Sequence, residues 1–251
     1  MTVLVPVLHG RTLSSRLELM ERLHGAGFDV VPHLAARRIS SRDELRGFLD
    51  EARRMGALRR VLIIGGDPER VAGQYADATA VLESGLLQDY GVSEVGFAGY
   101  PEGHPRLAAD VIRSALLAKL ETASRLGLGY HVITQFSFVP ARILEYCAWL
   151  STAAAGTPVY AGVAGPASIR QLVHFARYCG VAASLSAVAK VGVKVAQLTS
   201  HMRVDEQLGL LASRVESRAR GSSNLTGIHL FSFGGFTATA QWMRDHITAV
   251  A

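Results

Sequence analysis

Few residues in this chain suit cross-linking or membrane insertion. Among 251 residues there are only two cysteines, Cys147 and Cys179, and each lies in an apolar, helical stretch. A disulfide or thiolate metal site is therefore not indicated, and we expect two core thiols. No run of about eighteen uncharged apolar residues occurs, and the first ten residues lack the basic flank and cleavage site of a signal peptide. We therefore expect a soluble, cytoplasmic protein that binds no membrane.

Several catalytic signatures are also missing. The chain has no glycine-rich loop ending in Lys-Ser or Lys-Thr, no G-x-S-x-G motif and no histidine pair at metal-ligand spacing. The segment "GLGYHV", which begins at Gly127, precedes a predicted strand, whereas a dinucleotide fingerprint follows one. These absences argue against a metal-dependent or acyl-enzyme mechanism, and we predict no metal site.

The positive charge of the chain is not concentrated in a patch. The formal net charge is +5, yet the basic residues are spread among acidic ones, with local pairs only at Arg37-Arg38, Arg53-Arg54 and Arg59-Arg60. No aromatic residues alternate with these pairs, as a stacking surface for nucleic acid would require. We therefore expect no nucleic acid partner, and we expect the net positive charge of the protein to attract an anionic small molecule.

Short β-rich runs alternate with helical segments throughout the chain. This pattern is typical of an α/β protein with a parallel sheet. No linker divides residues 1–251, so a single (βα)8-type TIM barrel domain is predicted, incomplete because only seven strands are recognisable. A doubly wound open sheet is the structural alternative. The stretch 182–221 is long enough to hold more than one helix. The predicted strands cover residues 2–8, 28–32, 60–65, 94–100, 130–138, 158–163 and 227–233.

Two helix starts have the spacing of a capping box. Ser15 with Glu18 precedes one apolar helical face, and Ser41 with Glu44 precedes another. The glycines at positions 25 and 27 are expected to end the first of these helices.

Asp67 follows Gly65 and Gly66 at the end of a predicted strand. The glycines permit a tight turn and a close approach of the backbone to a ligand. A carboxylate at this point can accept a hydrogen bond from a heterocycle or direct a proton. The alternative is that Asp67 caps the next helix, because Asp-Pro is also a common start of a turn.

The strand near residue 95 ends in the run "AGYPEGHP", which gathers Tyr100, Glu102 and His104. An imidazole can act as acid, base or donor, and a tyrosine offers an aromatic face together with a hydroxyl. The alternatives are a histidine that stabilises the turn and a half-buried core tyrosine.

His33 and Gln135 stand at two further strand ends. An amide offers both a donor and an acceptor to the edge of a pterin-like ring, whereas the alternative for Gln135 is a local hydrogen bond at the strand end. His33 is either a pocket donor or a core histidine. The neighbouring Phe136 and Phe138 are expected to pack in the core. Together these strand ends predict one pocket rim.

These motifs resemble the methylenetetrahydrofolate reductases over nearly the whole chain. The resemblance rests on "VVPHLAARRISSRDEL", "VLIIGGDPER", "VGFAGYPEGHP", "VITQFSF", "PVYAGVAGPAS" and "GIHLFSF", in the order and with the approximate spacing of the family. The run "AGYPEGHP" is the most specific of them. The sequences "PHLAAR" and "GGD" resemble those of a smaller, divergent bacterial branch of the family.

The resemblance implies a (βα)8 barrel in which FAD passes hydride from NAD(P)H to methylenetetrahydrofolate in one-carbon metabolism. It implies that Asp67 lies near both flavin and folate, that Gln135 binds the pterin, and that Glu102 or Asp67 relays the proton. It further implies that the flavin is held at positions His33, Gly66, Tyr75, Ala76, Tyr100, His104 and Lys119.

The chain departs from the family pattern at several positions. The segment "TVLVPVLHG" aligns with the second strand of the family, so the first strand and its proton-donating glutamate lack a counterpart. Gly234-Gly235 stands where Asn-Arg is common, Ala189 stands near a second family glutamine, and "GGD" replaces Arg-Gly-Asp. A barrel lacking one strand exposes edges, so we expect a homo-oligomer or a paralogous subunit to cover them.

Two other functions remain open from the sequence. One is a non-catalytic folate-binding or regulatory subunit that acts with a paralogous reductase chain. The other is a flavin-free enzyme in which reduced nicotinamide transfers hydride directly.

Overall fold

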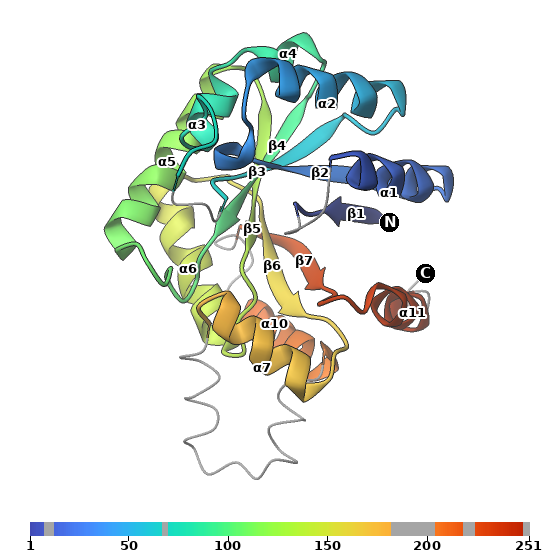
Figure 1. The fold of residues 1–251 in the computed structure, drawn as a ribbon. Helices are drawn as coiled ribbons and strands as arrows, with labels where there is room; N and C mark the ends of the chain where they lie inside the picture. The colour runs from blue at the N-terminus through green and yellow to red at the C-terminus, as the bar shows by residue number, and fades with distance from the viewer. Residues whose placement is uncertain (8–12, 67–69, 182–203, 218–223, 248–251) are drawn as a thin grey trace. The chain divides into compact units, whose positions relative to one another are not determined.

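The computed structural model describes residues 1–7, 13–66, 70–181, 204–217 and 224–247 (Figure 1). Seven strands follow one another in the sheet in chain order, from β1 to β7. The pairings of β1 with β2, β2 with β3, β3 with β4, β5 with β6, and β6 with β7 are all parallel. Parallel strands in sequential order with helical crossovers are the topology of the (βα)8 barrel. The predicted α/β fold of incomplete TIM-barrel type is thus confirmed.

The chain divides into two compact units. The first comprises Met1–Ala98 and Ala115–His131, and the second comprises Gly99–Ser114 and Val132–Ala251. Strands β4 (Glu94–Gly99) and β5 (Gly129–Thr134) and helix α5 (Ala109–Arg125) contribute residues to both. Each unit is described by itself below, and the single barrel domain over residues 1–251 stays a prediction.

The first unit contains three complete strands and the short helices between them. They are β1 (Thr2–Val5), α1 (Leu13–Gly25), β2 (Asp29–Ala35), the 3-10 helix η1 (Ala36–Arg38), α2 (Arg42–Arg54), β3 (Arg60–Ile64), α3 (Ala78–Leu82) and α4 (Leu86–Asp89). Helix α2 is strongly amphipathic, and its apolar residues Leu45, Phe48, Leu49 and Ala52 are all buried. This periodic apolar face is why one side of α2 is buried in the unit.

Only one of the two predicted capping boxes starts a helix. Ser41 is the N-cap of α2 and accepts a hydrogen bond from the Glu44 backbone N–H at 3.0 Å, as predicted. The Glu44 carboxylate, however, accepts from the N–H and hydroxyl of Ser40. The prediction at Ser15 was wrong, because α1 already includes Leu13. Helix α1 does end at Gly25, and Gly27 has a φ of 83°.

Within the described residues, the second unit contains two complete strands and the helices around them. They are α6 (Pro140–Ala153), β6 (Val159–Ala164), α7 (Ile169–Tyr178), α10 (Val204–Ser217), β7 (Leu225–Phe231) and α11 (Phe236–Ile247). All seven predicted strands are therefore present, with ends shifted by a few residues. Of the predicted helical stretch 182–221, only residues 204–217 are described, so the expectation of several helices falls mostly outside the described residues.

An aromatic cluster forms the core of the second unit. Phe136 is fully buried and contacts Phe138, Phe231 and Phe233, with ring centroids 4.9–5.6 Å apart. Phe136 and Phe138 therefore pack in the core, as predicted. Cys147 is buried, Cys179 is partly buried against the same cluster, and neither is paired in a disulfide within the described residues. The expectation of a core thiol is confirmed for Cys147, and Cys179 packs at the edge of the core.

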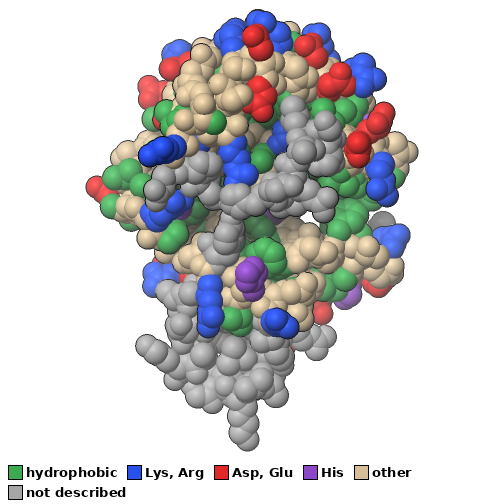
Figure 2. Space-filling view, viewed as in Figure 1, with side chains coloured by type: hydrophobic (Ala, Val, Ile, Leu, Met, Phe, Trp, Pro, Cys, Tyr) green, Lys and Arg blue, Asp and Glu red, His purple; other side chains and the backbone are tan. Residues whose placement is uncertain are grey.

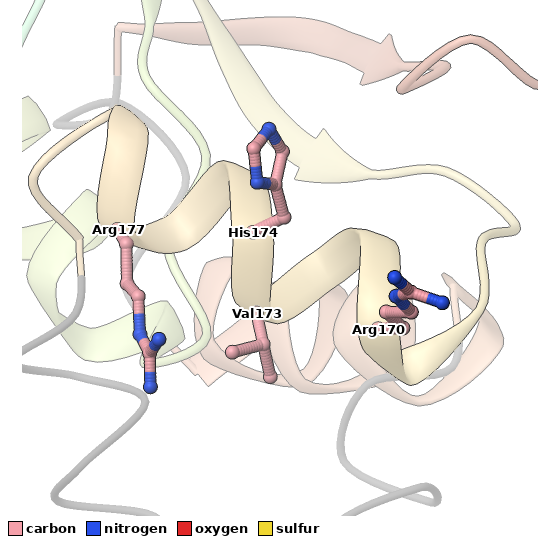
Figure 3. A pocket seen from close by; sticks show the side chains of 4 residues that line it. All are labelled: Arg170, Val173, His174 and Arg177. Atoms are coloured by element: carbon pink, nitrogen blue, oxygen red, sulfur yellow. The ribbon is translucent and has the colours of Figure 1, made fainter.

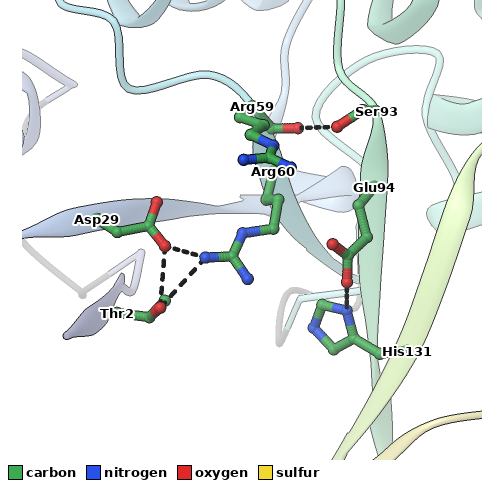
Figure 4. Close-up of polar contacts among 7 residues, drawn as sticks. All are labelled: Thr2, Asp29, Arg59, Arg60, Ser93, Glu94 and His131. Atoms are coloured by element: carbon green, nitrogen blue, oxygen red, sulfur yellow. Dashed lines mark hydrogen bonds and ion pairs between the residues drawn. The ribbon is translucent and has the colours of Figure 1, made fainter.

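Polar contacts tie the strands of the first unit together (Figure 4). The Arg60 guanidinium on β3 pairs with the Asp29 carboxylate on β2, which also accepts a hydrogen bond from the Thr2 hydroxyl at 2.9 Å. On the next strands, His131 Nδ1 lies 2.5 Å from Glu94 Oε1. His131 is only 6% exposed, so the buried imidazole depends on this carboxylate as its polar partner.

The buried His131 predicts a pH-dependent stability. Burial lowers the pKa of His131 more than the Glu94 carboxylate raises it, so the unfolded chain takes up this proton more readily than the folded one. The free energy of unfolding therefore falls as the pH drops through the unfolded pKa of about 6.5, until the folded pKa is passed. We expect His131→Gln to reduce the fall in melting temperature between about pH 7 and about pH 5. The exposed His24 provides the control, since His24→Gln should keep the wild-type slope, and equal slopes in all three proteins would contradict this role of His131.

Charged side chains of both signs intermingle on the surface over α2 (Figure 2). Along this helix Arg46, Arg53 and Arg54 each pair with a carboxylate three residues earlier, at 3.3, 3.6 and 2.5 Å. Such exposed pairs contribute little to stability, but they offset the positive charge of the helix. The predicted absence of a concentrated basic patch therefore holds for α2. Within the described residues, no helix combines the length and apolar character needed to cross a membrane.

Candidate ligand site at the strand ends

The carboxyl end of β2 carries His33 and is held by a side chain from α1. Arg16 Nη1 donates a hydrogen bond to the His33 carbonyl oxygen at 3.1 Å, and the guanidinium lies 4.3 Å above the ring centroid of Phe48. Burial lowers the pKa of Arg16 to about 10, while Glu44 opposes this shift. The half-buried His33 therefore stands on a strand end whose backbone is fixed by an enclosed cation.

The segments that follow β2 and β3 are bonded to one another. The Arg37 backbone N–H donates to the Gly65 carbonyl at 2.9 Å, and Arg37 Nε donates to the Ala76 carbonyl at 3.0 Å. Gly73 passes so close that a Cβ there would lie 2.2 Å from the Ser40 carbonyl oxygen. The predicted residues Gly66 and Ala76 are thus parts of one braced pair of loops, in which Gly66 has a φ of 91°.

Asp67, the predicted carboxylate of this turn, lies outside the described residues. The alternative role considered for it was that of cap for the following helix. That helix, α3, has Asp77 as its N-cap, with Asp77 Oδ1 accepting from the Ala80 backbone N–H at 3.0 Å. The cap of α3 is therefore Asp77, and the ligand role of Asp67 stays a prediction.

Tyr75 and Lys119 both place polar atoms in enclosed surroundings. The Tyr75 side chain is 2% exposed, and its hydroxyl has no hydrogen-bond partner among the described residues. Burial lowers the pKa of Lys119, an effect that Asp77 opposes. The Lys119 ammonium lies 5.6 Å from the ring centroid of Phe97, and no described carboxylate lies within ion-pair distance of it. An unpartnered hydroxyl and an unpaired cation are groups that a bound ligand could satisfy.

The predicted turn after β4 is present in the second unit. The Gly103 backbone N–H donates to the Tyr100 carbonyl at 3.1 Å, and Gly103 has a φ of 85°. Pro101 then occupies the position of the turn that favours proline. The Tyr100 and His104 rings meet edge to face, with centroids 5.2 Å apart. Glu102 is half-buried within this turn.

His104 stabilises the turn, which is the alternative role considered for it from the sequence. His104 Nδ1 accepts a hydrogen bond from the Arg106 backbone N–H at 3.2 Å. In the neutral ring the proton then resides on Nε2. Nδ1 thus stabilises the turn, and a role for Nε2 as donor to a ligand stays a prediction.

Gln135 leaves the end of β5 beside the same turn. Its backbone N–H donates to the Gly99 carbonyl at 2.7 Å, and its side-chain Oε1 accepts from the Phe136 backbone N–H at 3.2 Å. The local hydrogen bond considered as the alternative is thus present. Because the side-chain carbonyl of Gln135 already accepts this hydrogen bond, the amide nitrogen is the group that we expect to contact a ligand.

The structure gathers the predicted site residues in two sets. His33, Gly66, Tyr75, Ala76 and Lys119 belong to the first unit, and Tyr100, Glu102, His104 and Gln135 belong to the second. In the second set the residues follow the ends of β4 and β5. In the first set Gly66 follows β3, whereas His33 lies within β2, Lys119 lies in α5, and Tyr75 and Ala76 directly precede α3. The convergence of both sets on one ligand stays a prediction.

Three contributors to these loops were missed at the level of the sequence. Arg16 and Tyr146 sit inside helical stretches with no motif, and Arg37 was noted only as half of a basic pair. Each makes its contact with the backbone of a residue far along the chain, so no local pattern marks it.

One described hollow lies apart from these residues. It has a volume of about 490 Å³ and is lined by Arg170, Val173, His174 and Arg177 of α7 (Figure 3). None of the predicted site residues lines it. Among the described residues, no group of three or more histidine, cysteine or carboxylate side chains is placed to hold a metal ion.

Comparison with known proteins gives a matching family and a number of similar solved structures, one of which is described here. The family model described as methylenetetrahydrofolate reductase matches residues 9–197. The crystal structure of 3-dehydroquinate dehydratase from Geobacillus kaustophilus HTA426 is 15% identical, and the alignment covers 63% of this chain and 71% of that chain with a TM-score of 0.35. A likeness at this level carries no functional argument, whereas the family match spans more than half of the chain.

Proposed function

Since this chain belongs to the methylenetetrahydrofolate reductase family, we propose that it interconverts 5,10-methylenetetrahydrofolate and 5-methyltetrahydrofolate by hydride transfer. The match over residues 9–197 carries the proposal, because it includes every predicted site residue from His33 to Gln135. Tetrahydrofolate derivatives are the proposed substrates, and NAD(P)H is the proposed source of hydride.

The residues of the first unit suit FAD as the cofactor. The unpartnered Tyr75 hydroxyl can bond a polar edge of the flavin, and the enclosed Lys119 ammonium suits an anionic group. His33, Gly66 and Ala76 would complete this part of the site, with Tyr100 and His104 contributed by the second unit. FAD would supply the hydride-carrying chemistry, and the protein the orientation and electrostatics.

Three side chains are proposed to act on the substrate. Gln135 would hold the pterin edge through its amide nitrogen, since its Oε1 is engaged by the Phe136 N–H. Asp67 would hold the heterocycle and direct a proton to it. Glu102, half-buried in the turn after β4, is the second candidate for the proton relay.

A second candidate function is a non-catalytic folate-binding or regulatory subunit that works with a paralogous reductase chain. The turn after β7 favours it. There Gly234 has a φ of 83°, so the Gly234-Gly235 pair that stands in place of Asn-Arg is built into a turn that glycine favours. The Gly234-Gly235 pair itself offers no side chain to a ligand. Oligomerisation of this chain stays a prediction.

A visible absorption spectrum of freshly purified protein, followed by titration with methyltetrahydrofolate, tests these functions. We expect the yellow absorption of bound flavin and its bleaching as methyltetrahydrofolate is added. Bleaching shows that the bound substrate can deliver hydride, which supports the proposed reaction. Protein that binds methyltetrahydrofolate without turnover, until a paralogous reductase is added, would select the regulatory subunit. Colourless protein that oxidises NAD(P)H with methylenetetrahydrofolate would select direct transfer without flavin.

A further inference from the structure

Helix α7 of the second unit carries a stripe of basic side chains on one side. Leu172 and Ala176 are buried in the aromatic cluster, so another side of the helix is left to solvent. Arg170, His174 and Arg177 are exposed and stand four and three residues apart, a spacing that aligns them along one side of an α-helix. These three side chains line the hollow of about 490 Å³ described above.

The positive charge of this stripe is not neutralised by neighbouring carboxylates. No aspartate or glutamate occurs between Glu145 and Asp205 in the sequence, whereas the arginines of α2 each have a carboxylate three residues earlier. Neither Arg170 nor Arg177 forms an ion pair or a hydrogen bond with another described residue. The acid-free stretch is thus an exception to the mixture of charges over α2, and its two described guanidinium groups are available to an anion.

Helix α7 is a fixed platform for these side chains. Ser168 and Gln171 form a capping box at its start, and Gln171 Nε2 donates to the Phe233 carbonyl oxygen at 3.4 Å. The His174 ring lies 5.3 Å from the Phe175 ring between centroids, and the Phe175 ring lies 4.8 Å from that of Phe233 in the aromatic cluster. The imidazole beside the hollow is therefore held to the core through aromatic contacts.

The lining of the hollow combines two separated cations with an apolar side chain and a ring. Figure 3 shows Arg170 and Arg177 toward the two ends of the helix, with Val173 and His174 between them. Seven residues of an α-helix span about 10 Å, so the two long side chains can bind both ends of a chain of linked phosphates. A guanidinium group binds phosphate through paired hydrogen bonds, and the valine and imidazole offer a surface to a planar ring.

We propose that this hollow is a second ligand site, which binds a nucleotide with two or more linked phosphates. The phosphates bind Arg170 and Arg177, and the base lies against Val173 and the His174 ring. The volume of the hollow falls in the range of about 300–1,000 Å³ that is usual for sites of small molecules. The site shares no residue with the set assigned to flavin and folate, so it does not depend on the proposed reaction.

Equilibrium titration of the full-length protein with ADP tests the proposal. The protein is first loaded with FAD and freed of excess flavin, so that ADP does not enter the proposed flavin site. ADP should bind more tightly than either adenosine or inorganic pyrophosphate. Arg170→Gln and Arg177→Gln should each raise the dissociation constant of ADP by about tenfold, the loss expected for one charge-assisted hydrogen bond. Arg22→Gln is the matched control, since it removes an exposed arginine of α1 in the first unit, and it should keep the wild-type value.

The outcomes separate this proposal from the proposed function. Weaker ADP binding in both α7 variants, with the control unchanged, supports the site. Absence of ADP binding, or equal affinity in the wild type and both α7 variants, overturns it. Pyrophosphate that binds as tightly as ADP overturns the assignment to a nucleotide. Bleaching of the flavin by methyltetrahydrofolate should be the same in the wild type and the α7 variants. If the wild-type protein binds no FAD, the flavin assignment fails, while the ADP titration still decides this proposal.

Discussion

Gly162→Ala is expected to abolish the accumulation of soluble, folded protein. A Cβ at position 162 on β6 would lie 2.2 Å from the Thr134 carbonyl oxygen and 2.8 Å from the Phe136 backbone nitrogen. Both atoms belong to the backbone, so no side-chain rotation relieves the contact. The Gly162 N–H also donates to the Thr134 hydroxyl at 2.8 Å, and separation of the strands would break this bond. We expect a cost above about 3 kcal/mol, a large share of the roughly 5–15 kcal/mol of a typical domain.

Soluble yield and melting temperature measure this effect, and Gly47→Ala is the matched control. Gly47 lies in the exposed face of α2, and a Cβ there would have no neighbour within 4 Å. The same substitution at that position should raise the free energy of unfolding by about 0.5–1 kcal/mol, because alanine favours the helix. A wild-type melting temperature for Gly162→Ala would show that β5 and β6 can separate without loss, against the packing described here.

Asp67→Asn is expected to lower turnover by roughly a hundredfold, the lower range for loss of general acid–base help. Asparagine keeps the shape and hydrogen-bonding capacity of aspartate but removes its charge. The dissociation constant of methyltetrahydrofolate should therefore change by less than about threefold, since an interaction made mainly in the transition state affects turnover and leaves ground-state binding nearly intact. Stopped-flow measurement of turnover and equilibrium titration of folate together give this separation.

Asp89→Asn is the control for the loss of one negative charge. Asp89 is exposed at the end of α4, and its substitution should leave turnover and folate affinity unchanged. If Asp67→Asn retains wild-type turnover, Glu102 becomes the leading candidate for the proton relay. If folate affinity and turnover fall together, Asp67 serves mainly in binding.

The fold was predictable because its signals are local. Each strand is a short apolar run bounded by glycine or polar residues, and the spacing of Leu45, Phe48, Leu49 and Ala52 marks the buried face of α2. The error at Ser15 has the same origin. Serine and glutamate three residues apart satisfy the capping pattern, but the helix begins before Ser15, so the pattern alone does not fix where the first turn forms.

The candidate site was predictable only as far as its strand ends. Tyr100, His104 and Gln135 lie where the sequence placed them, because a polar residue directly after a buried strand must emerge at the sheet edge. The contacts that fix these residues were not predictable. The bond from Arg16 to the His33 carbonyl and the approach of Tyr146 to Gly99 each join side chains to backbone across elements, and neither leaves a periodic trace in the chain.

The bracing of the loops after β2 and β3 by Arg37 uses main-chain groups of its partners, namely the carbonyls of Gly65 and Ala76 and the N–H of Ala72. The exposed side chain at position 76 can therefore be exchanged during evolution without loosening the scaffold that presents it. Loops anchored through their peptide groups allow ligand preference to diverge between related proteins while the architecture is conserved. Substitutions intended to alter ligand preference should therefore begin at such a side chain and leave Arg37 in place.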